Sequence, residues 1–217
     1  MPELKGRLQT DIDYFRERVL TDPVGVLDPE GVVHHEFVSG NHGRKLDFDK
    51  IKNGTDFYID WVAIYARAVL SIYPQRRPDA FVGIANGANR LSKSVGNLLG
   101  IAGLTTEKVD AKTVKLDEAA LDSVEENDFS FILTIEDVGT TGGTTATAVN
   151  DLRRVGIPRI ESVNFWQRNP SLPRLDDLRI PYSAVILNPL PMFSPAVCDS
   201  NPDGYCANQV TLIPHEK

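Results

Sequence analysis

Four short apolar runs, each bounded by turn-forming residues, do most to limit the folds open to this chain. The first two runs are continuous and typical of strands buried in a parallel sheet, and the other two read as further strands. Segments with helical patterns separate several of them, such as "LSKSVGNLLG" after the first run and "TTATAVNDLRRVG" after the second. The alternation predicts an α/β protein with a central parallel sheet flanked by helices. The runs are "AFVGI" (80–84), "FILTI" (131–135), "RIESVNFW" (159–166) and "SAVILN" (183–188).

Further elements are expected on either side of these runs. Apolar residues from Leu4 to Val19 recur at steps of three and four, which predicts an amphipathic helix. A second helix, "DFYIDWVAIYARAVLSIY", is predicted to begin after a Thr55 cap and to be closed by Pro74. "VVHHEFVSGNHGRKLDFDKI" reads as a strand or hairpin.

The remaining segments carry weaker signals. "ANGANR" is expected to be the loop after the first run, and weak strands are expected near 104–107 and 113–116, joined by a turn that contains lysine. The tail after Pro189 is rich in Pro and Asn and is expected to be irregular.

Composition excludes several classes of protein. A chain of 217 residues suits one globular domain with a sizeable core, and the net charge of −7 argues against a nucleic-acid partner. No apolar run approaches the roughly 18 residues that a membrane span needs. Two cysteines, Cys198 and Cys206, make no disulfide framework, so we expect a cytoplasmic protein.

The stretch "ILTIEDVGTTGGT" carries the clearest chemical signal. Glu136 and Asp137 come at the end of a predicted buried strand, where open α/β sheets bind ligands. The loop "GTTGGT" then leads into a helix, so its backbone N–H groups, the helix N-terminus and the Thr hydroxyls make an anion site. Carboxylates suit a sugar diol and the loop suits a phosphate, so the stretch predicts a phosphorylated pentose as ligand.

This stretch resembles the phosphoribosyl-diphosphate (PRPP) fingerprint of type I phosphoribosyltransferases. The resemblance implies a parallel sheet flanked by helices, a small N-terminal hood and a mobile lid. It implies that Glu136 and Asp137 hold the ribose hydroxyls and that Mg²⁺ is held mainly by PRPP itself, with no direct protein ligand. It also assigns the 5′-phosphate to the loop residues Thr140, Thr141, Gly142, Gly143 and Thr144.

Other segments are most similar to orotate phosphoribosyltransferases. "HHEFVSGNHGRKLDFDK" resembles their N-terminal segment, which implies that Ser39, Gly40 and His42 wall the base pocket. Arg168, after the strand "NFWQ", stands where these enzymes place an arginine that pairs with the base carboxylate, a group that a guanidinium binds bidentately. Thr140 is expected beside the base as well.

Two segments resemble the sites for the leaving pyrophosphate. "FVGIANGANR" matches the pyrophosphate loop, with Asn86 and Gly87 at the diphosphate; Arg90 is either a further contact or a solvated helix residue. "TTEKVDAKTVKL" matches the lid, which implies that Lys108 and Lys112 reach the pyrophosphate, although a plain surface hairpin stays an alternative.

Together the resemblances imply a single phosphoribosyltransferase domain over 1–217, with a PRPP-binding core over about 55–190 and a hood made of about 1–50 plus the C-terminal tail. The implied reaction is Mg²⁺-dependent transfer of 5-phosphoribosyl from PRPP to orotate, with Asp137, Glu136 and Lys108 as catalytic residues, in a homodimer. Two alternatives stay open: a purine or uracil as the base, and a non-catalytic PRPP-sensing regulator.

Overall fold

The computed structural model describes residues 2–21, 26–27, 33–36, 42–51, 53–110, 112–190 and 192–213, with the backbone alone at residues 2–5, 33–36, 42 and 86. The chain divides into two compact units. The larger contains residues 1–15 and 52–188, and the smaller contains residues 16–51 and 189–217.

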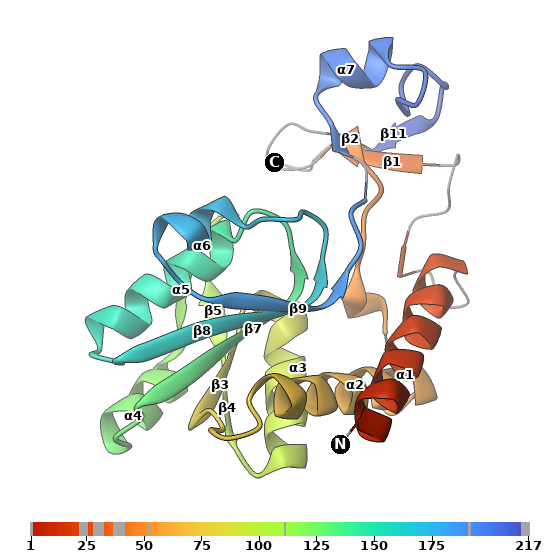
Figure 1. Ribbon diagram of the computed structural model, residues 1–217. Helices are drawn as coiled ribbons and strands as arrows, with labels where there is room; N and C mark the ends of the chain where they lie inside the picture. Colours follow the sequence, from red (N-terminus) through yellow and green to blue (C-terminus); the bar gives the residue numbers. More distant parts are fainter. Residues whose placement is uncertain are drawn as a thin grey trace. The chain divides into compact units, whose positions relative to one another are not determined.

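A five-stranded sheet forms the centre of the larger unit (Figure 1). All of its neighbouring strands run parallel, which confirms the central parallel sheet predicted from the four apolar runs. In spatial order the strands are β4 (Ala102–Leu104), β3 (Ala80–Gly83), β7 (Phe131–Gly139), β8 (Arg159–Gln167) and β9 (Tyr182–Leu187).

Helices cover both faces of this sheet (Figure 1). The helices α2 (Asp56–Ile72) and α3 (Ala85–Leu99), with the first part of α1 (Pro2–Thr21), lie on one face. The helices α4 (Glu118–Glu126), α5 (Gly143–Arg154) and α6 (Pro173–Asp177) lie on the other. The predicted Thr55 cap is confirmed, since its hydroxyl accepts a 3.3 Å hydrogen bond from the Tyr58 N–H. The sequence did not predict α4, which buries only Ala120 and Val124 and so lacks a wide apolar stripe.

Aromatic rings join α1 and α2 to the first face. Phe15 stacks on Phe57 with ring centroids 4.5 Å apart and meets Phe165 of β8 edge-on at 5.2 Å. Trp61 and Tyr65 also contact Phe165, and all five rings are almost completely buried. Burial of each such side chain stabilises the fold by about 1.5–3 kcal/mol, so this cluster fixes the α1–α2 layer on the sheet.

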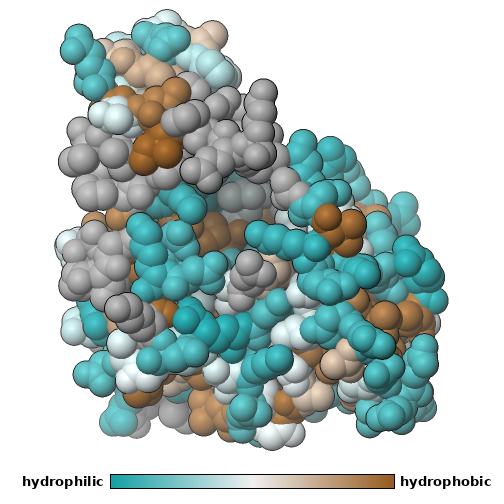
Figure 2. Space-filling model, turned by 180° about the vertical axis from the view of Figure 1, so that it is seen from behind, coloured by the Kyte–Doolittle hydropathy of each residue, from teal (hydrophilic) through white to brown (hydrophobic). Residues whose placement is uncertain are grey.

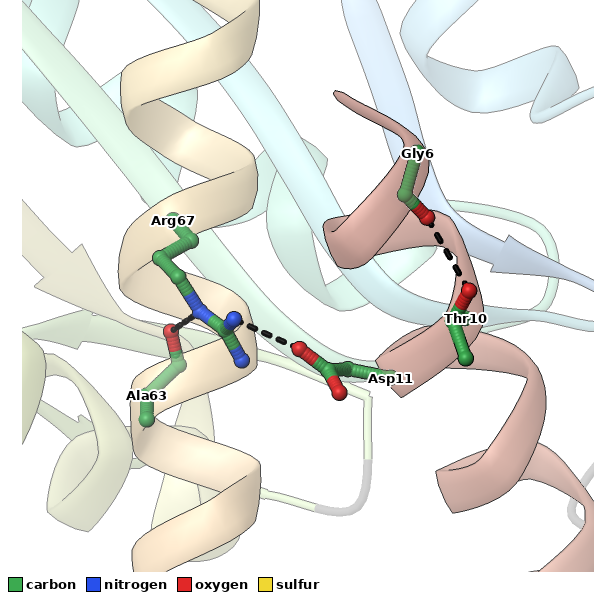
Figure 3. Close-up of polar contacts among 5 residues, drawn as sticks. All are labelled: Gly6, Thr10, Asp11, Ala63 and Arg67. Atoms are coloured by element: carbon green, nitrogen blue, oxygen red, sulfur yellow. Dashed lines mark hydrogen bonds and ion pairs between the residues drawn. The ribbon is translucent and has the colours of Figure 1, made fainter. Parts of the chain in front are cut away.

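A polar contact supports the same packing at the surface (Figure 3). Arg67 Nη1 of α2 lies 2.6 Å from Asp11 Oδ2 of α1, and the Arg67 Nε–H donates to the Ala63 carbonyl over 3.3 Å. Thr10 in turn donates its hydroxyl to the Gly6 carbonyl within α1. Because both charged groups are about half exposed, the pair adds about 0–1 kcal/mol, far less than the aromatic cluster.

The opposite face carries an aliphatic core beneath α4, α5 and α6. Every second residue of β3 and β7 points into it, as Val82 and Ile132 do. The helices contribute Ala148, Val149 and Leu152 from α5 and Leu175 from α6. This core fixes α5 on the sheet through the middle and the end of the helix.

Two boundaries differ from the prediction and both concern the expected site. The segment "ANGANR" is the first part of α3, which begins at Ala85, so the expected loop is wrong. The strand β7 continues from Ile135 through Glu136 and Asp137 to Gly139, because β8 pairs with it along this length. The two acids are therefore strand residues and not loop residues.

A two-stranded antiparallel hairpin, β5 (Thr106–Lys108) and β6 (Val114–Leu116), stands where the weak strands were predicted. Asp117 caps α4 directly after it by accepting from the Ala120 N–H over 2.8 Å.

The smaller unit contains a four-stranded sheet in the order β10-β2-β1-β11. The strands β1 (Val33–Glu36) and β2 (His42–Gly43) pair antiparallel, which confirms the predicted hairpin. The expectation of an irregular tail is wrong, because the tail forms β10 (Met192–Phe193), α7 (Pro195–Ser200) and β11 (Thr211–Ile213). A 3-10 turn, η1 (Phe48–Lys50), completes the unit.

Both cysteines are free thiols in this tail, and the Cys206 N–H donates to Cys198 Sγ over 3.2 Å. Burial of the Cys206 thiol, with the neighbouring Cys198 thiol, raises its pKa to about 12. Across the described residues, no three His, Cys, Asp or Glu side chains gather as a metal site would require.

Hydrophilic residues cover most of the face shown in Figure 2, and hydrophobic residues there form separate patches. Within the described part of the chain, no helix combines the length and apolar character needed to cross a membrane.

Candidate functional site

The acid pair lies near the carboxyl end of β7. Glu136 lies on the α5 side, where its Oε2 accepts a 2.8 Å hydrogen bond from the Thr145 hydroxyl. Asp137 Oδ1 accepts a 2.8 Å bond from the Val138 N–H. The two carboxyl groups also lie close enough to hydrogen-bond each other. Both acids are thus gathered at the end of one strand.

The environment of Glu136 favours its neutral form. Burial raises the pKa of the Glu136 carboxyl well above its ordinary value, and the charge of Asp137 raises it further. The Thr145 hydrogen bond and the ammonium of Lys108 act in the opposite direction and are weaker. A strongly shifted carboxyl at the end of a sheet strand is typical of a ligand site.

The loop after β7 is fixed by hydrogen bonds to its carbonyl groups. The carbonyl oxygens of Gly139, Thr140, Thr141 and Gly142 all accept hydrogen bonds from protein donors. The donors, in the same order, are Arg168 N (2.9 Å), Asn169 Nδ2 (2.6 Å), Arg174 N (3.1 Å) and Ala146 N (2.9 Å).

The N–H groups of the same loop, unlike its carbonyls, make no hydrogen bonds among the described residues. Residues 140–144 find no backbone or side-chain acceptor for their N–H groups among the described residues. Gly142 has φ +74°, which glycine adopts without strain, and this turn directs the chain into α5. N–H groups at the start of a helix are suited to bind an anion, so the phosphate role predicted for the Thr–Gly loop is compatible with this geometry and stays a prediction.

Asn164 supports this loop and was not predicted. It pairs in register with Glu136 from β8, and its side chain is 1% exposed. A methyl group on Gly139 would lie 2.6 Å from Asn164 Oδ1, so the amide fills the space beneath Gly139. The Asn164 amide atoms and Ser162 Oγ have no hydrogen-bond partner within the described structure. The signal in the sequence was a polar residue inside the apolar strand "SVNFW".

The predicted pyrophosphate segment is a sharp strand-to-helix turn. Ala85 has φ +57°, an uncommon conformation for alanine, and its N–H donates to Thr106 Oγ1 over 2.9 Å. The Thr106 hydroxyl donates to the Gly83 carbonyl, and Asn89 bonds both backbone groups of Thr106. The hairpin therefore fixes the turn that presents the backbone of residues 86 and 87. The side chain of Asn86 lies outside the described atoms.

Arg90 packs against α2. Its guanidinium carbon lies 4.9 Å from the Tyr58 ring centroid and 5.9 Å from that of Trp61. The Tyr58 hydroxyl also bonds Ser94 Oγ over 2.6 Å. The arginine thus joins α2 to α3, while its contact with pyrophosphate stays a prediction.

The predicted lid is anchored at its base and short at its tip. The N–H groups of Val114 and Leu116 donate to Thr147 Oγ1 (3.0 Å) and Asp151 Oδ2 (3.3 Å) of α5. Lys108 and Lys112 are exposed near the tip. The described structure thus brings Lys108 close enough to lower the pKa of Glu136, while Lys112 lies in the turn.

The residues predicted to contact the base are only partly described. Arg168 follows β8 beside the loop and is 2% exposed. Ser39 and Gly40 lie outside the described residues, and at His42 only the backbone, in β2, is described. The roles of these residues and of Thr140 toward a base stay predictions.

Among the described residues, no group of acidic, imidazole or thiol side chains could hold a magnesium ion by protein ligands alone. Mg²⁺ commonly binds largely through substrate phosphates. The expectation that PRPP itself would hold the ion, with no direct protein ligand, therefore stays a prediction.

No protein-family model and no curated protein sequence matches this chain. Solved structures do resemble it. An orotate phosphoribosyltransferase from Mycobacterium tuberculosis H37Rv in complex with PRPP is 17% identical, with a TM-score of 0.55 over 81% of this chain and 95% of that one. An adenine phosphoribosyltransferase from Saccharomyces cerevisiae, complexed with adenine, is 14% identical, with a TM-score of 0.53 over 66% and 86% of the two chains.

A UMP synthase from Leishmania donovani is 15% identical, with a TM-score of 0.58 over 80% of this chain. This chain spans about a third of that protein, 35% of its length. The parallel sheet, its helices and these three structures together show that the chain has the fold of the type I phosphoribosyltransferases, most like that of the orotate enzymes.

Proposed function

We propose that this protein transfers the 5-phosphoribosyl group of PRPP to a nucleobase, with orotate as the favoured base. The observation that carries the proposal is the loop after β7. Its carbonyls accept hydrogen bonds from protein donors, and its N–H groups find no acceptor among the described residues. Two carboxylates precede it in the chain. A phosphorylated ribose needs this combination of anion donors and diol acceptors.

The roles of the residues follow from where charge develops. Loss of pyrophosphate leaves positive charge on the ribosyl carbon, which Glu136 and Asp137 stabilise once ionised. Hydroxyl donors from the ribose favour the ionised form of Glu136 and offset the burial that raises its pKa. Lys108 stabilises the negative leaving group, and Mg²⁺ supplies further positive charge at the diphosphate when bound.

Orotate is favoured over other bases by Arg168. It follows β8 next to Gly139, to which its backbone N–H is bonded over 2.9 Å, so it lies at the carboxyl end of the sheet. A carboxylate on the base matches a guanidinium. A purine base is the second candidate, because the similar yeast structure is an adenine phosphoribosyltransferase.

Pyrophosphate release tests the proposal directly. The protein is mixed with PRPP and Mg²⁺ and with orotate, adenine, hypoxanthine, guanine or uracil in turn. Release with orotate supports the first candidate, and release with another base supports the second. PRPP binding without release from any base would leave a PRPP-sensing regulator. Absence of PRPP binding would refute all three.

Two variants separate chemistry from base choice. Lys108→Ala is expected to lower kcat by about 10²-fold while PRPP binding is retained, because its charge acts mainly on the leaving group. Arg168→Ala is expected to raise KM for orotate and leave KM for PRPP unchanged. Arg168→Lys, which keeps the charge and loses the fork, is expected to be intermediate.

We also propose a homodimer, since lids of this family reach a neighbouring subunit. Light scattering after size-exclusion chromatography measures the mass directly. A mass close to the 24.0 kDa of one chain would contradict the dimer.

A further inference from the structure

A cavity of about 200 Å³ opens at the amino ends of β8 and β9, at the end of the sheet opposite the Thr–Gly loop. Three arginines from three elements line it: Arg153 in the last turn of α5, Arg159 at the first position of β8, and Arg179 after α6. Because β8 runs from Arg159 to Gln167, about 26 Å of strand separates this cavity from the loop. It therefore plays no part in the site proposed above.

The cavity is lined by arginines and by apolar side chains. The buried side chains of Ile157, Ile160 and Ile180 contribute to its lining. One acid lines it, Glu161, whose Oε1 lies 2.6 Å from Arg159 Nη2 and whose Oε2 accepts from the Tyr73 hydroxyl over 2.9 Å. Arg159 thus neutralises the only acidic charge in the lining.

Two guanidinium charges remain. Arg153 donates one bond, from Nη2 to the Leu178 carbonyl over 2.8 Å, and makes no ion pair with any described residue. Arg179 is exposed and makes no ion pair with the described residues either. In a chain of net charge −7, this leaves a local excess of positive charge around a preformed hollow.

Arg179 has a left-handed backbone conformation that is unusual for a residue with a side chain. It has φ +54° and stands just after α6, where its N–H bonds the Asp176 carbonyl and the next N–H bonds that of Leu175. Helices that end in this pattern usually have glycine at this position, because a side chain there is strained. Strained positions that retain a side chain are concentrated at binding sites.

We propose that this cavity binds a phosphate group, either free inorganic phosphate or the phosphate end of a small monoester. Guanidinium groups bind phosphate oxygens bidentately, and Arg153 and Arg179 each have donors left to do so. The volume of about 200 Å³ accommodates a phosphate and a few further atoms, and is smaller than the roughly 300–1,000 Å³ of pockets for larger organic ligands.

The test is an NMR titration of the ¹⁵N-labelled full chain with inorganic phosphate, with NaCl added to keep the ionic strength constant. Amides of residues 157–161 and 178–182 are expected to shift along a saturable curve. Amides of residues 139–146 report the Thr–Gly loop separately, so failure of one site is distinguishable from failure of the other. Shifts near the cavity that do not saturate would overturn the proposal.

Arg179→Gly provides the decisive variant, because glycine relieves the strained backbone and the fold is retained or becomes more stable. Phosphate affinity at the cavity is expected to fall at least tenfold, with the loop amides unaffected. Arg154→Gln is the matched control. Arg154 is an exposed arginine next to Arg153 in α5, and it pairs with Asp151 outside the cavity lining. Wild-type affinity in Arg179→Gly, or an equal loss in Arg154→Gln, would overturn the site.

The source of the phosphate is decided by a second titration, with glycerol 3-phosphate. Saturation by this monoester at equal or lower concentration supports a monoester ligand. Saturation by inorganic phosphate alone supports the free ion. Saturation by neither contradicts the proposal.

Discussion

The hydroxyl of Thr145 donates a 2.8 Å hydrogen bond to Glu136 Oε2 and so joins the first turn of α5 to the end of β7. Thr145 is 1% exposed, so this bond is sheltered from water. It is a main interaction that lowers the pKa of the Glu136 carboxyl against the effects of burial and of Asp137. The helix α5, which follows the Thr–Gly loop, therefore also influences the protonation of Glu136.

Thr145→Val removes this donor with little change of volume. The pKa of Glu136 rises further, and PRPP affinity near neutral pH is expected to fall roughly tenfold, as for the loss of one hydrogen bond to a charged group. Calorimetric titration with PRPP measures it. Thr145→Ser keeps the hydroxyl and should bind as the wild type does; equal binding by the valine variant would show that the bond has no role in affinity.

Glu136 also makes stability depend on pH. Its pKa is raised in the folded state, so its contribution to stability is complete below the unfolded pKa and is lost as pH rises through the folded pKa. Glu136→Gln removes that loss. The variant is expected to gain stability relative to the wild type as pH rises above the ordinary pKa of glutamate, as measured by urea unfolding at a series of pH values.

The control for this pH dependence is Glu125→Gln, which changes an exposed glutamate on α4. Its difference from the wild type should stay constant over the same range. A constant difference for Glu136→Gln as well would contradict the raised pKa.

Gly139 and Asn164 are expected to be energetically coupled. Gly139→Ala places a methyl group 2.6 Å from Asn164 Oδ1 and should lower the free energy of unfolding by about 1–3 kcal/mol. Asn164→Ala opens that space, so the double variant should recover part of the loss. A double-mutant cycle in urea gives the coupling free energy, and additive effects would show that the two side chains do not share this space.

The tip of the β5–β6 hairpin depends on Asp110. Its Oδ1 accepts from the N–H groups of Lys112 (2.7 Å) and Thr113 (2.8 Å), and these bonds, led by that from Lys112, lower the pKa of Asp110. In Asp110→Ala, hydrogen exchange at Lys112 and Thr113 should become faster. Exchange at Val114 and Leu116 should be unchanged, because α5 holds those residues.

Asp110→Asn retains an acceptor oxygen and is expected to keep the turn. In the wild type the turn should persist above the ordinary pKa of aspartate and loosen as pH falls through the lowered value. Faster exchange along the whole hairpin in Asp110→Ala would show that the base depends on the tip.

Local patterns in the sequence determined much of this molecule. The four predicted strands are neighbours in the parallel sheet, and its buried strands β3 and β7 contain the two continuous apolar runs, since a strand buried on both faces needs apolar side chains on each. Thr55 capped its helix as predicted, because a cap is a contact between residues three apart. The acids and the Thr–Gly loop were found for the same reason, as they follow one another along the chain.

Tertiary structure decided the features that depend on residues far apart in the sequence. Glu136 to Gly139 are strand because β8 pairs with them, and the tail forms strands because β1 and β2 supply partners. Ala85 begins α3 directly because Thr106 binds its N–H. Asn164 beneath Gly139 and the arginines around the cavity at the far end of β8 come from separate elements. Hydrogen-bond partners and close packing across the sheet are set by the three-dimensional arrangement, and no local pattern encodes them.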